Sequence, residues 1–310
     1  MRTLASAVLM VVPTTFGFDD QTAASNGFQK QTSLDIKTLR QLARGEYDNC
    51  AEALRAAGVC VVSIDYGSTQ DIPNAVFPNN WITTWPDGRI YLYAMATESR
   101  RRERSNLAID AIRKRFKVSD ILDMSDSEAD NRFLEGTGVI VFDHKNKIAY
   151  GCQSLRLDPI LFKDHARTLG YTPVLFNAAD LSGQPIYHTN VLMGVQTSTA
   201  VICAEAIDPG DRQRVISQLA STGHEVVELT FKQMAEYCGN IIQLQGTNSQ
   251  PVLLTSKSAW EAFTASQRSL LSYENEVISV PVPTIQAVGG GSVRCMTAEI
   301  FLQPLVKALA

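Results

Sequence analysis

The sequence Gly289-Gly290-Gly291-Ser292-Val293-Arg294-Cys295-Met296-Thr297 lies close to the C-terminus and leads into an apolar, strand-like run from Met296 to Leu302. Three consecutive glycines carry no Cβ, so the backbone can adopt positive φ and approach a ligand closely. A cysteine therefore stands where a tight turn meets a strand. Its thiolate would be a nucleophile, and Arg294 beside it would favour that charged form. The competing interpretation is that Cys295 is a small core residue, because free cysteine is often buried.

The composition is that of a soluble globular protein, with 310 residues, 45% hydrophobic and 19% charged. A net charge of −4 gives no general attraction to phosphate backbones, so no nucleic-acid partner is expected. No apolar run reaches the roughly 18 residues that cross a bilayer, so no membrane partner is expected either. The opening Met1-Arg2 and the run after it superficially resemble a short signal peptide. A convincing cleavage site is missing, which favours a first buried strand.

The six cysteines are widely scattered and show no C-x-x-C or paired Cys/His spacing. They are Cys50, Cys60, Cys152, Cys203, Cys238 and Cys295. Neither a disulfide framework nor a zinc site is indicated. Reduced thiols fit a cytoplasmic location best, and the sequence predicts no metal and no organic cofactor.

Strand and helix patterns recur in five blocks of about 55 residues, which amounts to an internal repeat. Each block has the order strand, strand, helix, strand, although the block sequences barely match. The simplest assembly is an α/β ring of five ββαβ modules with the helices outside. The final strand after Cys295 would return to the first module and close the ring. Periodicity alone leaves an open α/β sheet as the alternative.

Unusual polar residues recur at or near the start of the first strand of a module. They are Asn79 and Asn80, Glu135, His188 and Asn190, Asn240, and finally Cys295. Strand starts that converge on a central axis would bring all of these side chains to one site. This recurrence favours the ring over the open sheet.

A cysteine nucleophile needs a proton shuttle, and a shuttle histidine needs an orienting group. His188 opens an apolar strand, whereas His144, His165 and His224 are most simply solvated. Glu135 interrupts an apolar setting directly before Gly-Thr-Gly, where a buried carboxylate is costly unless it is paired or functional. A structural role for His188, as a satisfied core or edge histidine, is the competing interpretation.

Three segments together resemble the signatures of the guanidine-modifying superfamily, which includes arginine deiminases, dimethylarginine dimethylaminohydrolases and amidinotransferases. They are Leu134-Glu135-Gly136-Thr137-Gly138, Tyr187-His188-Thr189-Asn190 and the glycine-rich segment around Cys295. The sequence is most similar to the citrulline-utilisation hydrolase branch, in Phe16-Gly17-Phe18, Pro78-Asn79-Asn80-Trp81 and Gly239-Asn240 as well. The resemblance runs from about residue 8 to the C-terminus and implies a five-bladed α/β propeller, the pentein fold, as a single catalytic domain over residues 1–310.

The resemblance implies a role for each matching residue. Cys295 would be the nucleophile, His188 the acid and base, and Glu135 the group that orients or charges His188. The substrate-binding candidates are Asn79, Asn80, Asn190, Asn240 and Phe18, with Arg101, Arg294 and Asp19 for the amino-acid end of the substrate. The run Arg100 to Arg104 that contains Arg101 is more often a solvated helix face.

The departures from the superfamily pattern concern acids. Asn80, Asn190 and Gly138 stand where related enzymes usually have aspartates. A cationic guanidinium is best met by carboxylates, whereas an asparagine amide offers both a donor and an acceptor and suits a neutral ureido group. Other members of the superfamily also lack one of these acids, so one replacement decides little. Three replacements favour citrulline as the substrate.

The sequence therefore predicts a hydrolase that cleaves citrulline to ornithine, CO2 and ammonia through an S-carbamoyl enzyme. The alternatives are an arginine or methylarginine deiminase, an amidinotransferase, and a catalytically silent propeller in which Cys295 is merely packed. The expected partner is a small amino acid with a ureido or guanidino group. The oligomeric state stays open, with a homodimer among the options.

Overall fold

Five three-stranded sheets form the β structure of the protein, whose computed structural model describes residues 3–305. In every sheet the middle strand pairs antiparallel with one neighbour and parallel with the other. Met1 and Arg2, on which the signal-peptide resemblance partly rested, lie outside the described residues, as do residues 306–310 at the end of the expected domain. Within the described part, no helix is both long and apolar enough to cross a membrane.

The strands fall into one set per sheet. The first sheet has β15 (Ala298–Glu299), β1 (Ala7–Val11) and β2 (Cys60–Ile64), and the second has β3 (Ile82–Thr84), β4 (Arg89–Leu92) and β5 (Asp120–Asp123). The third has β6 (Ile140–Asp143), β7 (Ile148–Cys152) and β8 (Thr172–Phe176). The fourth has β9 (Met193–Val195), β10 (Thr199–Ile202) and β11 (Glu225–Glu228), and the fifth β12 (Ile242–Gln245), β13 (Pro251–Ser256) and β14 (Glu276–Val280).

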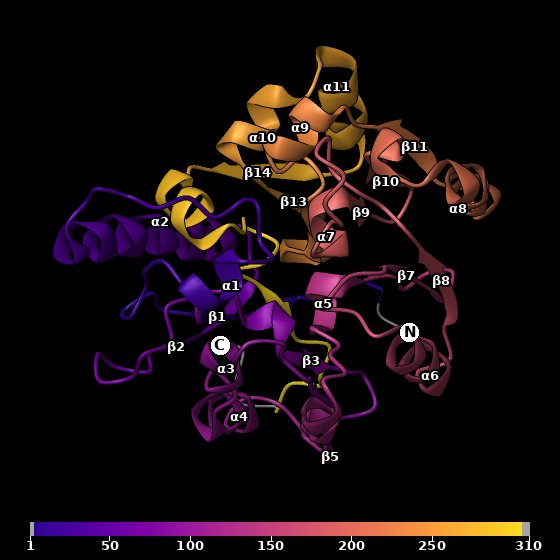
Figure 1. Ribbon diagram of the computed structural model, residues 1–310. Helices are drawn as coiled ribbons and strands as arrows, with labels where there is room; N and C mark the ends of the chain where they lie inside the picture. Colours follow the sequence, from indigo (N-terminus) through magenta and orange to yellow (C-terminus); the bar gives the residue numbers. More distant parts are fainter. Residues whose placement is uncertain (1–2, 306–310) are drawn as a thin grey trace.

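The described residues form the helices α1 (Asp20–Ala23), α2 (Ile36–Ala56), α3 (Glu98–Arg101), α4 (Asn106–Arg113), α5 (Gly136–Val139), α6 (Pro159–Thr168), α7 (Thr189–Leu192), α8 (Pro209–Ser221), α9 (Phe231–Ala235), α10 (Lys257–Ala262) and α11 (Ala265–Tyr273). Helices between the parallel strands of a sheet, such as α2, α6 and α8, lie at the rim of the molecule, whereas α5 and α7 connect one sheet to the next and lie near the centre (Figure 1). Two further segments matter for the site, the 3₁₀ turn η1 (Pro78–Asn80) and the π-helical turn η5 (Ile285–Gly289).

Side-chain caps explain where several helices begin. Asp35 caps α2 by accepting the N–H groups of residues 37 and 38, and Asp158 caps α6, which has a proline at its first position. Helix α2 continues through Gly45 without interruption. Ser105 is the N-cap of α4 and separates that helix from α3.

The predicted return of the C-terminal strand to the first module is confirmed. Strand β15 pairs antiparallel with β1, and Val8 lies opposite Glu299. The first sheet therefore contains strands from both the N-terminal and the C-terminal part of the chain.

A short turn of helix precedes the first strand of several sheets and carries the polar residues. Asn79 and Asn80 lie in η1 before β3, Glu135 immediately precedes α5 and β6, and His188 caps α7 before β9. The turns α5 and α7 contact one another, and α5 contacts η1. The polar residues of three different modules are therefore brought together, as the recurrence in the sequence predicted.

Candidate active site

Cys295 and His188 line the same small cavity, although more than a hundred residues separate them in the chain. The wall is formed by Thr22, Asn26, Asn74, Phe77, Asn80, Arg100, Arg156, Tyr187, His188, Gly289, Gly290, Gly291 and Cys295. Both Gly289 and Gly291 pack against the ring of Phe77, which a Cβ at Gly289 would approach to 2.7 Å. The glycines thus let the backbone before Cys295 come close to this wall.

The thiol of Cys295 is 2% exposed and receives amide donors from two modules. Asn240 Nδ2 lies 3.2 Å and Asn190 Nδ2 3.5 Å from Sγ. The same two amides are themselves fixed, since Asn240 Oδ1 accepts the backbone N–H of Arg294 and Asn190 Nδ2 donates to the carbonyl of Thr137. Both asparagine amides are therefore held with their N–H groups directed at the sulfur.

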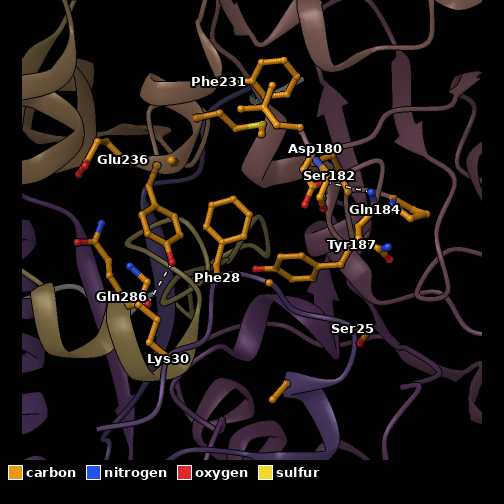
Figure 2. A pocket seen from close by; sticks show the side chains of 18 of the residues that line it. Ser25, Phe28, Lys30, Asp180, Ser182, Gln184, Tyr187, Phe231, Glu236 and Gln286 are labelled. Atoms are coloured by element: carbon orange, nitrogen blue, oxygen red, sulfur yellow. Dashed lines mark hydrogen bonds between the residues drawn. The ribbon is translucent and has the colours of Figure 1, made fainter.

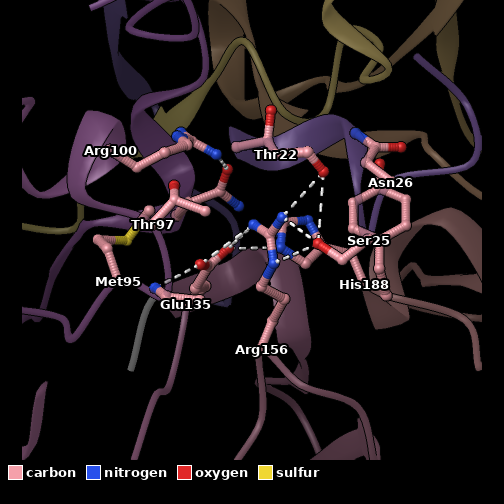
Figure 3. A network of polar contacts seen from close by, with 12 residues as sticks. Thr22, Ser25, Asn26, Met95, Thr97, Arg100, Glu135, Arg156 and His188 are labelled. Atoms are coloured by element: carbon pink, nitrogen blue, oxygen red, sulfur yellow. Dashed lines mark hydrogen bonds and ion pairs between the residues drawn. The ribbon is translucent and has the colours of Figure 1, made fainter. Parts of the chain in front are cut away.

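His188 is held by a buried carboxylate. Its Nε2 lies 2.8 Å from Glu135 Oε2, and Glu135 is fully buried at 0% exposure. Arg156 Nη1 donates to both oxygens of Glu135, at 2.9 and 3.2 Å, and the backbone N–H of Ala96 donates to Oε1 at 3.0 Å. Arg156 also reaches Ser25 Oγ at 2.7 Å and so ties the carboxylate to the segment after α1 (Figure 3).

This network fixes the protonation states around His188. Burial by itself would raise the pKa of the Glu135 carboxyl, but Arg156 and His188 more than offset it and the pKa is well below the usual range. Burial lowers the pKa of His188 to about 4 against the opposing effect of Glu135, so the imidazole is neutral at pH 7. With Nε2–H donated to the Glu135 carboxylate, Nδ1 carries the lone pair. A Cβ at Gly138 would lie 2.9 Å from that Nδ1, so the absence of a side chain at this position leaves the nitrogen open.

A second buried ion pair joins Arg100, which lines the cavity, to Glu103. Arg100 is 3% exposed and forms a fork with Glu103, with Nε–Oε1 at 2.7 Å and Nη2–Oε2 at 2.8 Å. Its remaining nitrogen, Nη1, donates to Asn80 Oδ1 at 2.7 Å, and Nη2 also donates to the carbonyl of Phe77. The Asn80 amide nitrogen is buried and has no hydrogen-bond partner within residues 3–305.

Some predicted binding residues lie away from the cavity wall. Arg101 is one-third exposed and reaches the carbonyl of Met95 and the carboxylate of Glu128. Arg294 pairs with Glu299 at 2.8 Å and lines a separate small cavity, so the donors at the sulfur are the asparagines rather than the neighbouring arginine.

Three further predicted residues away from the wall, Asp19, Phe18 and Asn79, have structural surroundings that the sequence did not reveal. Asp19 caps α1 and accepts from Asn74 and Ser99, while Phe18 packs against an apolar cluster. Asn79 is fully buried, its side-chain atoms have no partner within the described residues, and it does not line the cavity. Asp19 is connected to the wall by the hydrogen bond that it accepts from Asn74.

Sequence reasoning missed both arginines on the wall. Arg100 belongs to a basic run that was predicted to be solvated, which is wrong for this residue because Glu103 three positions later pairs with it inside the protein. Arg156 stands between Leu155 and Leu157, and a lone arginine between apolar residues was the available signal.

The prediction that His165 and His224 are solvated is also wrong. Both are buried, with exposed fractions of 4% and 5%. His165 Nε2 pairs with the hydroxyl of Tyr93 at 2.8 Å, and His224 Nε2 lies 3.1 Å from the carbonyl of Gln196. Neither lines the cavity around Cys295.

A much larger cavity of about 1090 Å³ lies beside the small one, and Tyr187 lines both (Figure 2). The ring of Phe28 lies between those of Tyr187 and Tyr237, with centroid distances of 6.1 and 5.3 Å. The Tyr187 hydroxyl donates to the carbonyl of Gly290 at 2.5 Å and fixes this wall. Since neither Cys295 nor His188 lines the large cavity, we place the chemistry in the small one.

No group of three or more histidine, cysteine, aspartate or glutamate side chains in the described part of the chain is arranged to hold a metal ion. The structure instead places a thiol and a neutral imidazole at one cavity, with a carboxylate hydrogen-bonded to the imidazole.

The fold and this arrangement define a member of the guanidine-modifying pentein superfamily. Within it, the chain belongs to the family described as N,N dimethylarginine dimethylhydrolase, eukaryotic, whose model matches residues 12–302. No curated protein matches the sequence.

Solved structures of similar fold come from enzymes of arginine chemistry. The N-terminal domain of ArgZ, an arginine dihydrolase from cyanobacteria, bound to substrate, is 14% identical with a TM-score of 0.72, over 96% of this chain and 99% of that chain. AgrE bound to L-arginine is 13% identical with a TM-score of 0.74, over 97% of this chain but only 41% of that chain. DDAH from Pseudomonas aeruginosa complexed with citrulline is 14% identical with a TM-score of 0.66, over 96% of this chain and 100% of that chain.

Proposed function

We propose that this protein is a cysteine-dependent hydrolase that cleaves the ureido group of citrulline to ornithine, CO2 and ammonia. One observation carries the choice of a neutral group: the cavity wall beside Cys295 contains asparagines and two arginines but no carboxylate among the described residues. A guanidinium cation buried there would find no anionic partner on the wall, because the nearest carboxylates, Glu103 and Glu135, are already paired with Arg100 and Arg156. A ureido group is neutral, and its oxygen can accept from the unpaired amide nitrogen of Asn80.

The proposed first step uses the neutral His188. The Cys295 thiol passes its proton to Nδ1 of His188, and the thiolate attacks the ureido carbon. The oxyanion that forms accepts a hydrogen bond from Asn80 Nδ2. The imidazolium, stabilised by Glu135, then protonates the departing nitrogen, so ornithine leaves and an S-carbamoyl enzyme remains.

The second step is hydrolysis of this thioester-like intermediate. His188 is neutral again after the first step and takes a proton from water as the water attacks the carbamoyl carbon. Collapse releases carbamate and returns the thiol, and carbamate decomposes to CO2 and ammonia. None of these reaction steps requires a metal or an organic cofactor.

The amino-acid end of citrulline would meet the inner polar wall. Arg156 donates from Nε and Nη2 to the hydroxyl of Ser25. The same two nitrogens could bind a carboxylate, so we propose that the substrate carboxylate replaces the Ser25 hydroxyl. Asn74 Oδ1 is a buried acceptor without a partner in the described part and suits the α-ammonium group. The cavity offers only about 10 Å³ for the centres of water molecules, enough for about one water. Citrulline therefore reaches Cys295 only after a wall segment such as Thr22–Asn26 moves.

The family match favours a second candidate, hydrolysis of an N-methylated arginine. That reaction would use the same thiol and imidazole with an alkylamine as the leaving group. A deiminase acting on arginine and an amidinotransferase differ in the leaving group or in the acceptor of the intermediate. We propose citrulline ahead of all three because the described wall contains no carboxylate.

The test incubates purified protein separately with citrulline, arginine and dimethylarginine and assays ornithine, citrulline and ammonia. We expect ornithine and ammonia from citrulline, loss of this activity in Cys295→Ser, and a carbamoyl adduct on Cys295 by mass spectrometry after rapid quenching. Citrulline formed from arginine or dimethylarginine, with none consumed, would assign the second class of reaction instead. Retention of full activity in Cys295→Ser would exclude the covalent route.

We further propose that the five sheets are the blades of one propeller and that residues 1–310 work as one catalytic domain. The reducing cytoplasm is the compartment proposed for it, since all six cysteines are unpaired.

A further inference from the structure

We propose that the buried pair Arg100–Glu103 sets the substrate specificity of the site by fixing which way the Asn80 amide points. This inference rests on the proposed hydrolysis of citrulline and concerns residues that the reaction itself does not use. It makes Arg100 and Glu103 positioning residues. Asn80, whose nitrogen would touch the substrate, is the group they position.

Asn80 has two chemically opposite ends, and its surroundings distinguish them. Arg100 Nη1 lies 2.7 Å from one end of the amide, and a guanidinium has only donors, so that end must be the oxygen. The nitrogen is thereby turned the other way. A Cβ at Gly138 would lie 2.2 Å from this nitrogen and 2.8 Å from Cε1 of His188, so the amide nitrogen and the imidazole both pack closely against Gly138.

The consequence is a buried donor with nothing to donate to. Asn80 is 1% exposed, it lines the cavity, and its Nδ2 has no partner within residues 3–305. Such a donor is costly unless a ligand acceptor satisfies it. A ureido oxygen is such an acceptor, whereas a guanidinium presents only N–H groups and would face donor against donor.

Glu103 is what keeps Arg100 in this orientation. It engages Nε and Nη2 of the guanidinium together, which leaves Nη1 as the nitrogen that faces Asn80. The carbonyl of Phe77 accepts from Nη2 as well, so the plane of the guanidinium is fixed from two sides. The hydroxyl of Tyr66 in turn donates to the backbone carbonyl of Glu103 at 2.7 Å and anchors that residue.

The same geometry predicts how the specificity can be inverted. In Asn80→Asp, Arg100 would hold one carboxylate oxygen, and the other oxygen would take the place of the unpaired nitrogen. The cavity would then present an anionic acceptor at the position where it now presents a donor. A guanidinium would gain a partner there, and a ureido oxygen would face another hydrogen-bond acceptor instead of a donor.

The experiment measures kcat/KM for citrulline and for arginine with wild type, Asn80→Asp and the double variant Arg100→Met/Glu103→Leu. The double variant removes both charges together, so that no unpaired charge remains inside the protein. We expect the ratio of citrulline to arginine kcat/KM to fall at least 100-fold in Asn80→Asp and about 10-fold in the double variant, whose amide is free to turn over. Binding of the two amino acids to the same variants in a Cys295→Ser background, measured by calorimetry, gives the ratio independently of turnover.

Asn79→Asp is the matched control, because it puts the same new carboxylate one residue earlier at a buried position that does not line the cavity. A general loss of structure would lower kcat/KM for both substrates together and leave their ratio unchanged. An unchanged ratio is the result expected for this control. An unchanged ratio in Asn80→Asp or in the double variant, with wild type hydrolysing citrulline, would overturn the positioning role alone. If wild type releases no ornithine from citrulline, the proposed function and this inference both fail.

Discussion

Two buried carboxylates are each paired with an arginine of the cavity wall, and the two carboxylates behave in opposite ways. Glu135 pairs with Arg156 and Glu103 pairs with Arg100, and both carboxylates are at most 1% exposed. The pKa of Glu135 is lowered, whereas that of Glu103 is raised by burial to about 7.

The difference lies in the number of donors each carboxylate receives. Glu135 accepts from Arg156, from His188 and from the backbone N–H of Ala96, whereas Glu103 accepts from Arg100 alone. Desolvation raises the pKa of both carboxyl groups, and only at Glu135 do the hydrogen-bond donors outweigh this effect. Glu135 is therefore a fixed charge suited to stabilising an imidazolium, whereas Glu103 is a group that can change its charge near neutral pH.

The largest effect that separates the two carboxylates concerns catalysis. In Glu135→Gln the amide nitrogen can donate to Nε2 of His188, which moves the ring proton to Nδ1 and removes the base from the cavity. We expect kcat/KM for citrulline to fall by about 10²- to 10⁴-fold. The matched change Glu103→Gln keeps a hydrogen bond to Arg100 and is expected to cost less than about tenfold. Steady-state assays of both variants, with circular dichroism to check folding, make the comparison. Equal losses would show that Glu135 has no special relation to the base.

The second contrast concerns stability. Arg156→Met leaves a buried, ionised Glu135 without its main counter-charge and is expected to lower the free energy of unfolding by about 3–5 kcal/mol. Arg100→Met is expected to cost less, about 1–3 kcal/mol, because Glu103 then takes up a proton near neutral pH. Urea unfolding at pH 7 measures both. A larger loss for Arg100→Met would contradict the proposed difference in charge.

The sequence could predict the repeating modules and the residues that open their strands, because both leave local patterns. Apolar runs and turn residues mark the strands, and a polar residue at the start of an apolar strand is conspicuous, as His188 and Glu135 were. The two arginines could not be assigned in the same way. Whether Arg100 faces water or Glu103 depends on how α3 packs against η1, and nothing in the run of four arginines around residue 102 distinguishes the buried one.

The third contrast concerns pH. The folded-state pKa of Glu103 is raised from 4.5 to about 7, so its stabilising contribution is complete below pH 4.5 and is lost as pH rises through 7. The folded-state pKa of Glu135 is lowered, so its contribution is complete above pH 4.5 and is lost only as the solution becomes more acidic.

Replacing Glu103 by Gln should therefore abolish a loss of up to about 3 kcal/mol that wild type undergoes between pH 4.5 and 7. Denaturant unfolding of wild type and Glu103→Gln at several pH values across this window measures the difference. Parallel curves for the two proteins would show that Glu103 does not titrate there. Below pH 4.5 the contribution of Glu135 falls in both proteins, together with those of the other carboxyl groups whose pKa is lowered, Asp35, Asp87, Asp158, Asp180 and Asp211.

The smallest effect is expected at Arg101, the neighbour of Arg100 and a residue that the sequence had proposed for substrate binding. Its side chain is 32% exposed, and its pairing with Glu128 is partly solvated. Glu128 keeps its contacts with Arg104 and with the N–H of Met95 when Arg101 is removed. Arg101→Ala should therefore lower the free energy of unfolding by at most about 1 kcal/mol.

The same variant should change kcat/KM for citrulline less than twofold, because the Arg101 side chain does not line the cavity. A rise in KM of tenfold or more with kcat unchanged would instead place Arg101 in contact with the amino-acid end of the substrate. Such a result would require α3 to rearrange when substrate binds, so comparing Arg101→Ala with Arg101→Lys would show whether the charge or the aliphatic stem is responsible.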